Sequence, residues 1–424
     1  MTTVPVFAQH NAAVHEQRAA ALTSHPPGTL VAGHKKDVVL TPQLALLANR
    51  VAIYGWHRAE GNPIQPLTLV HAATWADYSH GVRLVLREIT LNGARTTVDA
   101  VLADDSAWTL LSDEGPMRSP RYGEVQPILP TFAGEKWEAM FPGLGVRVVI
   151  CSPEKPAPAQ PVRLALYALP AGNTIEQTAG RAAKGPEDDW HFNIQHIAAQ
   201  TRWLRARVTD ANLFVAYLEC AEKSWVLWRR KHAGQEQRIL DAVCARFPQA
   251  KVVLTGHSAG GSLAFGYFDR VDTIPAEIER IALLDSDYAY ESAHSHDSKL
   301  SLWLHAAPAH RLVVLAYQDY VALLDGKTFV SENGGTWGRS QAMLADLDKR
   351  FPFTRADHDG LQRHLALDGR VEFLLKENPE KKILHTVQVE LNGFIHAMLA
   401  GTEQAGKDYT YLGARAYGEF VAKP

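Results

Sequence analysis

Residues 251–264 read KVVLTGHSAGGSLA. A short apolar run at 252–254 precedes Gly256-His257-Ser258-Ala259-Gly260, and a helix-like stretch follows. This is G-x-S-x-G between a predicted strand and a predicted helix, where a sharp turn presents a serine at the carboxyl end of a sheet. Residues two before and two after that serine crowd each other, and here both are glycine, Gly256 and Gly260. The pattern predicts a nucleophilic Ser258; a chance glycine-rich turn is the alternative interpretation.

A serine hydroxyl needs a base, and the base needs a carboxylate that orients it. In enzymes with such a turn, the acid and then the histidine follow the serine along the chain. Asp319 comes directly after the predicted strand 311–317, so it is our first candidate for the acid. Asp287, in LLDSDYAYE, ends the intervening strand and is the alternative acid. Either aspartate would also suit a plain helix or turn cap.

The candidate bases lie in ILHTVQVELNGFIHAML, which begins with the predicted last strand at 383–389. His396 follows Asn392-Gly393, past the end of that strand, where a loop would bring the ring over Ser258. We therefore predict that His396 is the base. His385 falls inside the predicted strand and is the alternative base; a core or surface role is the other interpretation of each histidine.

Two backbone N–H groups are needed to stabilise an oxyanion. Ala259, directly after the serine and at the head of a helix, supplies one of them. The second is expected from the loop after an early strand, here Ala171-Gly172-Asn173 in LALYALPAGNTIEQT. Gly172 would let the backbone approach the substrate closely.

From about residue 162, apolar strands alternate with amphipathic helices. The predicted strands are 162–169, 213–218, 251–255, 278–284, 311–317 and 383–389. This alternation predicts an α/β fold with a doubly wound, mostly parallel sheet over residues 145–424. No clean strand is visible between Val321 and Glu380, so we expect an insertion or lid around 321–380.

Residues 1–135 lack this alternation and read as a smaller, mainly β domain of unknown role. Polar residues cluster there among the short strands. They include His34, His57, His71, Asp77 and His80. They could form a second site for a metal, an anion, a glycan or catalysis, or could make ordinary loop hydrogen bonds. None has a strong metal-ligand spacing, so we assign no metal.

Composition excludes several classes of function. The chain has 424 residues and a net charge of −3, which gives no electrostatic case for binding nucleic acid. No apolar run approaches the length of a membrane span. The start, MTTVPVFAQHNAAVHEQ, resembles no signal peptide, and the three cysteines are too sparse for a disulfide framework. A cytoplasmic location without a cofactor is therefore our expectation.

From about Val146 to its end the chain resembles the α/β-hydrolase superfamily. The resemblance rests on the Gly256–Gly260 motif, Asp319 and His396 in that order, and on LYALPAGNTIEQT, FNIQHIAAQTRWLR and VELNGFIHAML. It implies a serine-hydrolase mechanism, usually on esters and sometimes on amides. The first third, with LVAGHKKDVVL and VAIYGWH, resembles an uncharacterised bacterial module that is preceded by more sequence. A truncated start would allow a secreted or periplasmic protein instead.

The sequence thus favours a carboxylic-ester hydrolase that acts on a small-molecule or polymeric ester through a Ser-His-Asp triad. An amidase or peptidase on the same triad is one alternative. A binding protein that keeps the hydrolase fold without its chemistry is another, because fold alone proves no activity.

Overall fold

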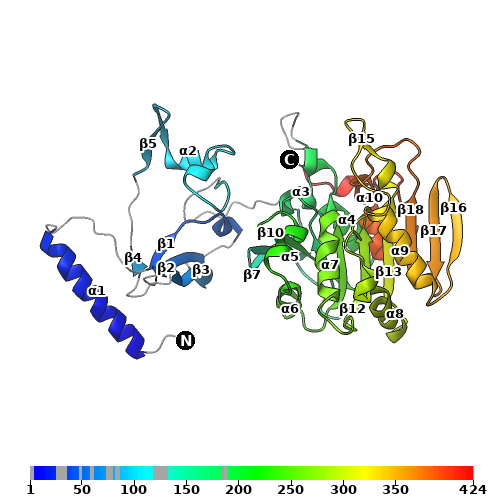
Figure 1. The fold of residues 1–424 in the computed structure, drawn as a ribbon, viewed down its shortest axis with the longest axis horizontal. Helices are drawn as coiled ribbons and strands as arrows, with labels where there is room; N and C mark the ends of the chain where they lie inside the picture. The colour runs from blue at the N-terminus through cyan, green and yellow to red at the C-terminus, as the bar shows by residue number, and fades with distance from the viewer. Residues whose placement is uncertain are drawn as a thin grey trace. The chain divides into compact units, whose positions relative to one another are not determined.

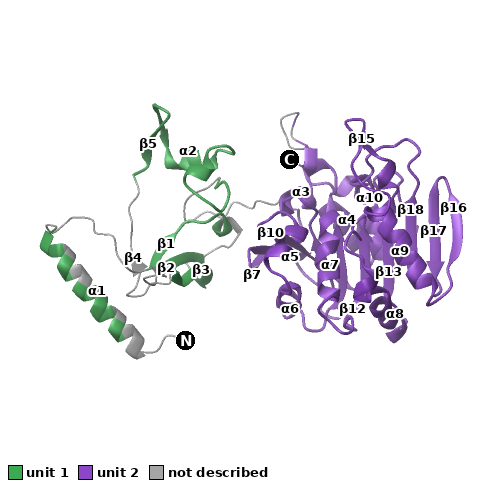
Figure 2. Cartoon of the chain, viewed as in Figure 1, with its two compact units in different colours: residues 1–128 green, residues 129–424 purple. Residues whose placement is uncertain are grey.

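The computed structural model describes residues 4–24, 36–46, 50–57, 62–72, 80–81, 86–117, 132–183, 185 and 190–423. The chain divides into two compact units, Met1–Ile128 and Leu129–Pro424 (Figure 2).

Unit 1 contains a small sheet, as the sequence predicts for the first third. The sheet has the order β3-β2-β1-β4, with antiparallel β3–β2 and β2–β1 pairs. Its strands are β1 (Lys36–Val39), β2 (Arg50–His57), β3 (Pro63–Ala72) and β4 (His80–Gly81). The other elements are α1 (Val4–Ser24), the hairpin β5 (Glu88–Leu91) and β6 (Ala94–Thr97), and α2 (Val98–Ala103). Asn92 and Gly93 join the hairpin with positive φ angles of 52° and 82°, as a two-residue turn requires.

Unit 2 is built on a ten-stranded sheet of order β16-β17-β18-β13-β12-β11-β9-β10-β8-β7 (Figure 1). The strands from β18 to β10 in this order are parallel, and the pairs at both edges are antiparallel. Their bounds are β7 (Glu135–Gly143), β8 (Val146–Pro153), β9 (Val162–Ala168), β10 (Asn212–Cys220), β11 (Lys251–His257), β12 (Ile278–Leu284), β13 (Arg311–Tyr317), β16 (Thr354–His358), β17 (Leu361–Ala366) and β18 (Val371–Lys376).

Helices cover the sheet in two layers. One layer holds α5 (Trp225–Lys231), α6 (Glu236–Cys244), α7 (Gly261–Phe268), α8 (His296–Ala306) and α9 (Thr336–Asp348). The other holds α3 (Ile175–Ala179), α4 (Ile197–Arg207), α10 (Val387–Glu390) and α11 (Gly393–Leu399). Because both faces are covered, the central strands are mostly apolar, and every residue of β10 is buried. The predicted α/β class with a mostly parallel sheet is confirmed.

The end of the sheet differs from the sequence-based expectation. The last strand is β18, so residues 383–386 belong to the loop before α10 and residues 387–389 belong to that helix. The expectation that 321–380 has no clean strand is also wrong, because β16, β17 and β18 complete the sheet. The prediction failed at β16 because that strand is exposed throughout, and at β18 because Glu372 interrupts its short apolar run. The remainder of this segment supplies α9 and the small hairpin β14 (Leu323–Leu324) and β15 (Lys327–Thr328).

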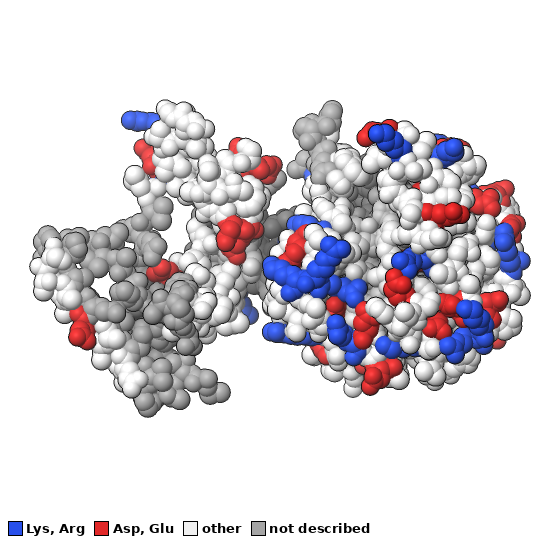
Figure 3. Space-filling model, in the orientation of Figure 1, with Lys and Arg blue, Asp and Glu red and all other residues white. Residues whose placement is uncertain are grey.

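Charge is mixed on the surface of unit 2. Figure 3 shows Lys and Arg interspersed with Asp and Glu on the visible face, and basic side chains gathered around α5. Within the described ranges, no helix has the length and apolar character needed to cross a bilayer.

Glycines allow the turn after β11 to pack against its neighbours. Gly260 has φ −59°, which any residue adopts, so its need for glycine is one of space. A Cβ there would lie 2.1 Å from the carbonyl oxygen of Ala168, the last residue of β9. A Cβ at Gly256 would lie 2.8 Å from the same oxygen. The turn is therefore pressed directly onto the end of the neighbouring strand.

Gly260→Ala is expected to lower the free energy of unfolding by about 1–3 kcal/mol, because the added methyl must displace backbone. Urea unfolding measures this. Gly418→Ala is the matched control, since a Cβ at Gly418 meets nothing within 4 Å. Equal stability of Gly260→Ala and the parent protein would contradict the close packing of this turn.

Candidate active site

Ser258 lies in a strained turn at the carboxyl end of the central strand β11. β11 ends at His257, a single 3-10 turn covers Ser258–Gly260, and α7 begins at Gly261. Ser258 has φ 55°, a left-handed conformation that a non-glycine residue seldom adopts. Such strain persists only where the surroundings enforce it, and it concentrates at functional sites. The turn has the local geometry of a nucleophile elbow.

Ser258 lines a cavity of about 180 Å³. The wall consists of the loop after β9, the 190–195 segment, the turn after β11 and the loop before α10. Its residues are Pro170, Ala171, Asn173, Trp190, His191, Ile194, Gln195, His257, Ser258, His385 and Thr386. Apart from histidine, none of these described wall residues carries an ionisable side chain.

His385 and Asp285 form a pair beside this cavity. His385 Nδ1 and Asp285 Oδ2 are 2.5 Å apart. Asp285 is fully buried and directly follows β12, whereas the His385 side chain is 23% exposed. With Nδ1 engaged, Nε2 is the ring nitrogen left for Ser258. The Ser258 hydroxyl and the His385 ring, both within the described residues, are not hydrogen-bonded to each other, as is common before a substrate binds.

His257 holds the backbone of His385. The His257 ring is buried, and its Nε2 lies 3.1 Å from the carbonyl oxygen of His385. The two ring centres are 4.5 Å apart. Burial, and then the neighbouring His385, lower the pKa of His257 well below its ordinary value, so the ring is neutral and its Nε2–H donates to that carbonyl. The residue before the serine thus ties the elbow to the loop that carries His385.

The loop after β9 lies against the same cavity. Ala171 and Asn173 line it, but the Gly172 N–H donates to the Lys223 carbonyl at 2.8 Å and is therefore not free for an oxyanion. A capping box at the start of α3, between Thr174 and Gln177, fixes the far end of the loop. Of the predicted donors in this loop, this leaves the Ala171 N–H and the Asn173 side chain, on residues that line the same cavity as Ser258.

The structure does not bring His396 to Ser258. His396 lies on α11, buried, with Nε2 3.0 Å from Glu372 Oε2 and Nδ1 3.1 Å from the Tyr409 hydroxyl. Both ring nitrogens are engaged there, and His396 does not belong to the cavity wall. The expectation for His396 is not met because β18, and not 383–389, is the last strand, which makes His385 the histidine of the following loop.

The predicted acids lie near the pair but do not contact His385. Asp319 Oδ2 accepts the Thr336 N–H at 2.8 Å, so Asp319 caps α9, the plain role that the sequence also allowed. The alternative acid, Asp287, accepts a hydrogen bond from Ser340 Oγ at 2.7 Å. The residue that contacts His385, Asp285, was missed. Its signal was its position as the first residue past the strand in LLDSD, two places before Asp287.

The polar cluster predicted in the first third is only partly described. His34 and Asp77 lie outside the described residues. His57 is the last residue of β2 and His80 the first of β4, and their side chains also lie outside what the structure describes. His71 is half-buried on β3. The proposal of a second site there therefore stays a prediction.

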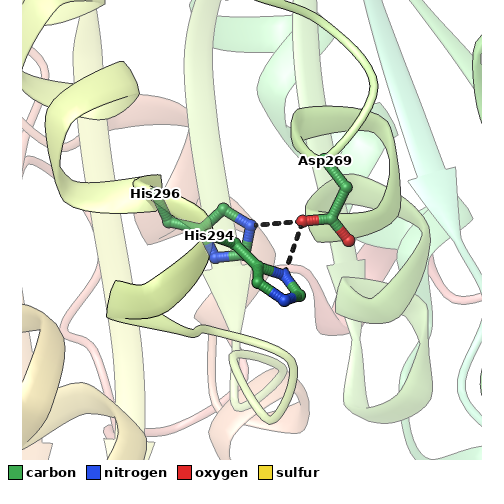
Figure 4. Close-up of side chains that lie close together, drawn as sticks. All are labelled: Asp269, His294 and His296. Atoms are coloured by element: carbon green, nitrogen blue, oxygen red, sulfur yellow. Dashed lines mark hydrogen bonds and ion pairs between the residues drawn. The ribbon is translucent and has the colours of Figure 1, made fainter.

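A cluster that the sequence analysis did not single out joins Asp269, His294 and His296 (Figure 4). Asp269 Oδ1 lies 2.8 Å from His294 Nδ1 and 2.9 Å from His296 Nε2, and Arg229 binds Oδ2. His296 Nδ1 accepts the Glu291 N–H, so its Nε2 carries the proton donated to Asp269. A metal on that Nε2 would have to displace this proton, so the donor pattern suits a hydrogen-bonded structural cluster.

No known family model matches the sequence, and no curated protein matches it. Solved structures are similar in fold. The siderophore hydrolase EstB from Aspergillus nidulans has 12% sequence identity and a TM-score of 0.36, over 65% of this chain and 97% of that one. A thermostable esterase has 12% identity and a TM-score of 0.38, over 63% of each chain. The feruloyl esterase module from Clostridium thermocellum has 8% identity and a TM-score of 0.38, over 64% of this chain and 91% of that one.

Proposed function

We propose that this protein is a serine hydrolase of carboxylic esters, with Ser258 as nucleophile, His385 as base and Asp285 as the acid that orients the base. One observation carries the proposal. A serine in a strained strand-to-helix turn shares a cavity with a histidine whose other ring nitrogen is bound to a buried carboxylate. Nucleophile, base and orienting acid are the parts that acyl transfer through a serine requires.

The reaction would begin when Ser258 Oγ attacks the ester carbonyl carbon and His385 Nε2 takes the hydroxyl proton. Asp285 stabilises the imidazolium that forms and keeps Nδ1 protonated. The N–H groups of Ala259 and Ala171 would stabilise the oxyanion. His385 then protonates the leaving alcohol, and a water activated by the same ring releases the acid from Ser258.

The cavity wall favours an uncharged acyl group. Its described residues include no Asp, Glu, Lys or Arg, and their polar side-chain groups are amides, imidazoles, hydroxyls and the Trp190 indole. Trp190 is 61% exposed on this wall, whereas Trp225 and Trp228 are core residues. These described residues offer an ionised substrate group no carboxylate, ammonium or guanidinium partner, and desolvating such a group without a partner would be costly. Neutral short-chain esters are therefore the first substrates to test.

A fluorescent fluorophosphonate is expected to label the parent protein and not Ser258→Ala, because the probe needs an activated serine and an oxyanion hole. Labelling is read on a denaturing gel, with hydrolysis of p-nitrophenyl acetate measured beside it. Circular dichroism of both proteins controls for folding. A folded parent protein that neither labels nor hydrolyses the ester would refute the proposed function.

Substitutions of His385 and of His396 are expected to affect different properties of the protein. His385→Asn should reduce the labelling rate by about 10³-fold or more, because the serine loses its base. His396→Asn should leave the rate within a few fold but lower the free energy of unfolding by about 3 kcal/mol, because buried Glu372 loses a partner. Labelling kinetics and urea unfolding measure the two effects. A large loss of labelling rate in His396→Asn with little loss in His385→Asn would instead identify His396 as the base.

Substitution also distinguishes Asp285 from Asp319 as the acid that orients His385. Asp285→Asn should lower kcat for p-nitrophenyl acetate by about 10³- to 10⁴-fold, since the amide cannot hold His385 in the required tautomer. Asp319→Asn keeps an oxygen for the α9 cap, so we expect a loss of about tenfold or less. Steady-state kinetics on both folded variants decide this. A larger loss in Asp319→Asn than in Asp285→Asn would make Asp319 the acid.

A further inference from the structure

We propose that Thr336, at the start of α9, is a positioning residue that fixes the Asp285 carboxylate through a hydrogen bond held in place by Asp319. This inference rests on the proposed function for its catalytic meaning, but its geometry can be tested without activity. The Thr336 hydroxyl donates to Asp285 Oδ1, while Asp285 Oδ2 binds His385. Each oxygen of the carboxylate thus has its own partner.

Asp319 fixes the backbone from which the Thr336 hydroxyl projects. Its Oδ2 accepts the Thr336 N–H at 2.8 Å and is a second, more distant acceptor for the hydroxyl, at 3.3 Å. Gly335 makes this approach possible, because a Cβ there would lie 2.0 Å from Asp319 Oδ2. The helix N-terminus also favours a carboxylate at this place. Thr336 and Asp285 are fully buried and Asp319 is 1% exposed, so water does not replace these contacts.

The arrangement explains why two aspartates lie at neighbouring strand ends. Asp285 follows β12 and Asp319 follows β13, and both reach the same threonine at the head of α9. The side chain of a β-branched residue is stiff, so a threonine fixed through its own backbone N–H has little freedom to turn its hydroxyl away. A carboxylate held at both oxygens cannot rotate, and a His385 ring bound to it keeps one orientation.

Ionisable groups surround Asp319 from several elements: Asp285 and Asp287 after β12, Tyr288 beyond them, Tyr317 on β13, and His385 in the loop before α10, paired with Asp285. Burial, and then the charge of Asp285, raise the pKa of Asp319 to about 6. Above that pH the ionised Asp319 is the stronger acceptor for the Thr336 N–H.

The same helix offers a matched control one turn later. Ser340 Oγ donates to Asp287 Oδ2 at 2.7 Å, and Ser340 and Asp287 are both fully buried. Thr336 and Ser340 are four residues apart and face the same strand end. Ser340→Ala therefore removes a buried hydroxyl from the same helix face without touching the Asp285–His385 pair.

The test compares Thr336→Val, which keeps the shape and removes the hydroxyl, with Thr336→Ser, which keeps the hydroxyl, and with Ser340→Ala. Two readouts are taken on each folded protein. The first is kcat and KM for p-nitrophenyl acetate across pH. The second, which needs no activity, is the pH titration of the His385 ring signals by NMR, assigned with His385→Asn.

Thr336→Val is expected to lower kcat about ten- to a hundredfold with KM little changed, because misplaced groups slow the chemical step more than binding. Its His385 titration should move to higher pH, since an Asp285 carboxylate without a donor keeps more of its charge for the imidazolium. Thr336→Ser keeps the hydroxyl, so its kcat and its His385 titration should stay near those of the parent protein. The same is expected of Ser340→Ala.

Three results would overturn the inference: an unchanged His385 titration in folded Thr336→Val, an equal shift in Ser340→Ala, or no rescue by serine. If the parent protein proves inactive, the proposed function fails, but the NMR titration still decides whether Thr336 positions Asp285. If the parent protein is active and the titration does not move, the function stands and the positioning role fails.

Discussion

The lack of room for a Cβ atom at the glycines around the turn after β11 is the constraint on which the site depends. Gly256 and Gly260 let the turn lie against the carbonyl oxygen of Ala168, and Gly261 does the same against the backbone of Ser286, where a Cβ would lie 1.6 Å from the carbonyl oxygen. The turn is thus pinned between the ends of β9 and β12. Ser258, in the middle, is forced into a left-handed conformation that it would not adopt in an unconstrained loop.

This packing also explains why the other groups meet at Ser258. Ala168 leads into the loop that carries Ala171, and β12 leads directly into Asp285. Because parallel strands end at the same edge of the sheet, every strand that borders β11 delivers its following loop to the same place. The buried ring of His257 then ties the elbow to the loop of His385. The site is therefore assembled from strand ends that the sheet itself aligns.

Much of this could be predicted from the sequence. The central strands are apolar because helices cover both of their faces, so β12 and β13 were placed at their observed bounds. The exposed edge strand β16 has no such signal, and in β18 the charged Glu372 interrupts the apolar run, so the predicted last strand shifted from β18 to residues 383–389. That single error moved the predicted base from His385 to His396. The choice between Asp285, Asp287 and Asp319 depends on which side chain faces the histidine, and spacing alone does not encode that direction.

The assignment of Ser258, His385 and Asp285 as the catalytic groups is tested most directly by a crystal structure of the protein inactivated with a small organophosphonate, which mimics the tetrahedral intermediate. This assignment predicts phosphorus bonded to Ser258 Oγ and a phosphonyl oxygen at about 2.7–3.1 Å from the N–H groups of Ala259 and Ala171. His385 Nε2 should lie within hydrogen-bond distance of Ser258 Oγ, with Nδ1 still on Asp285. An adduct on another residue, or a Ser258 adduct flanked by a different histidine, would contradict it.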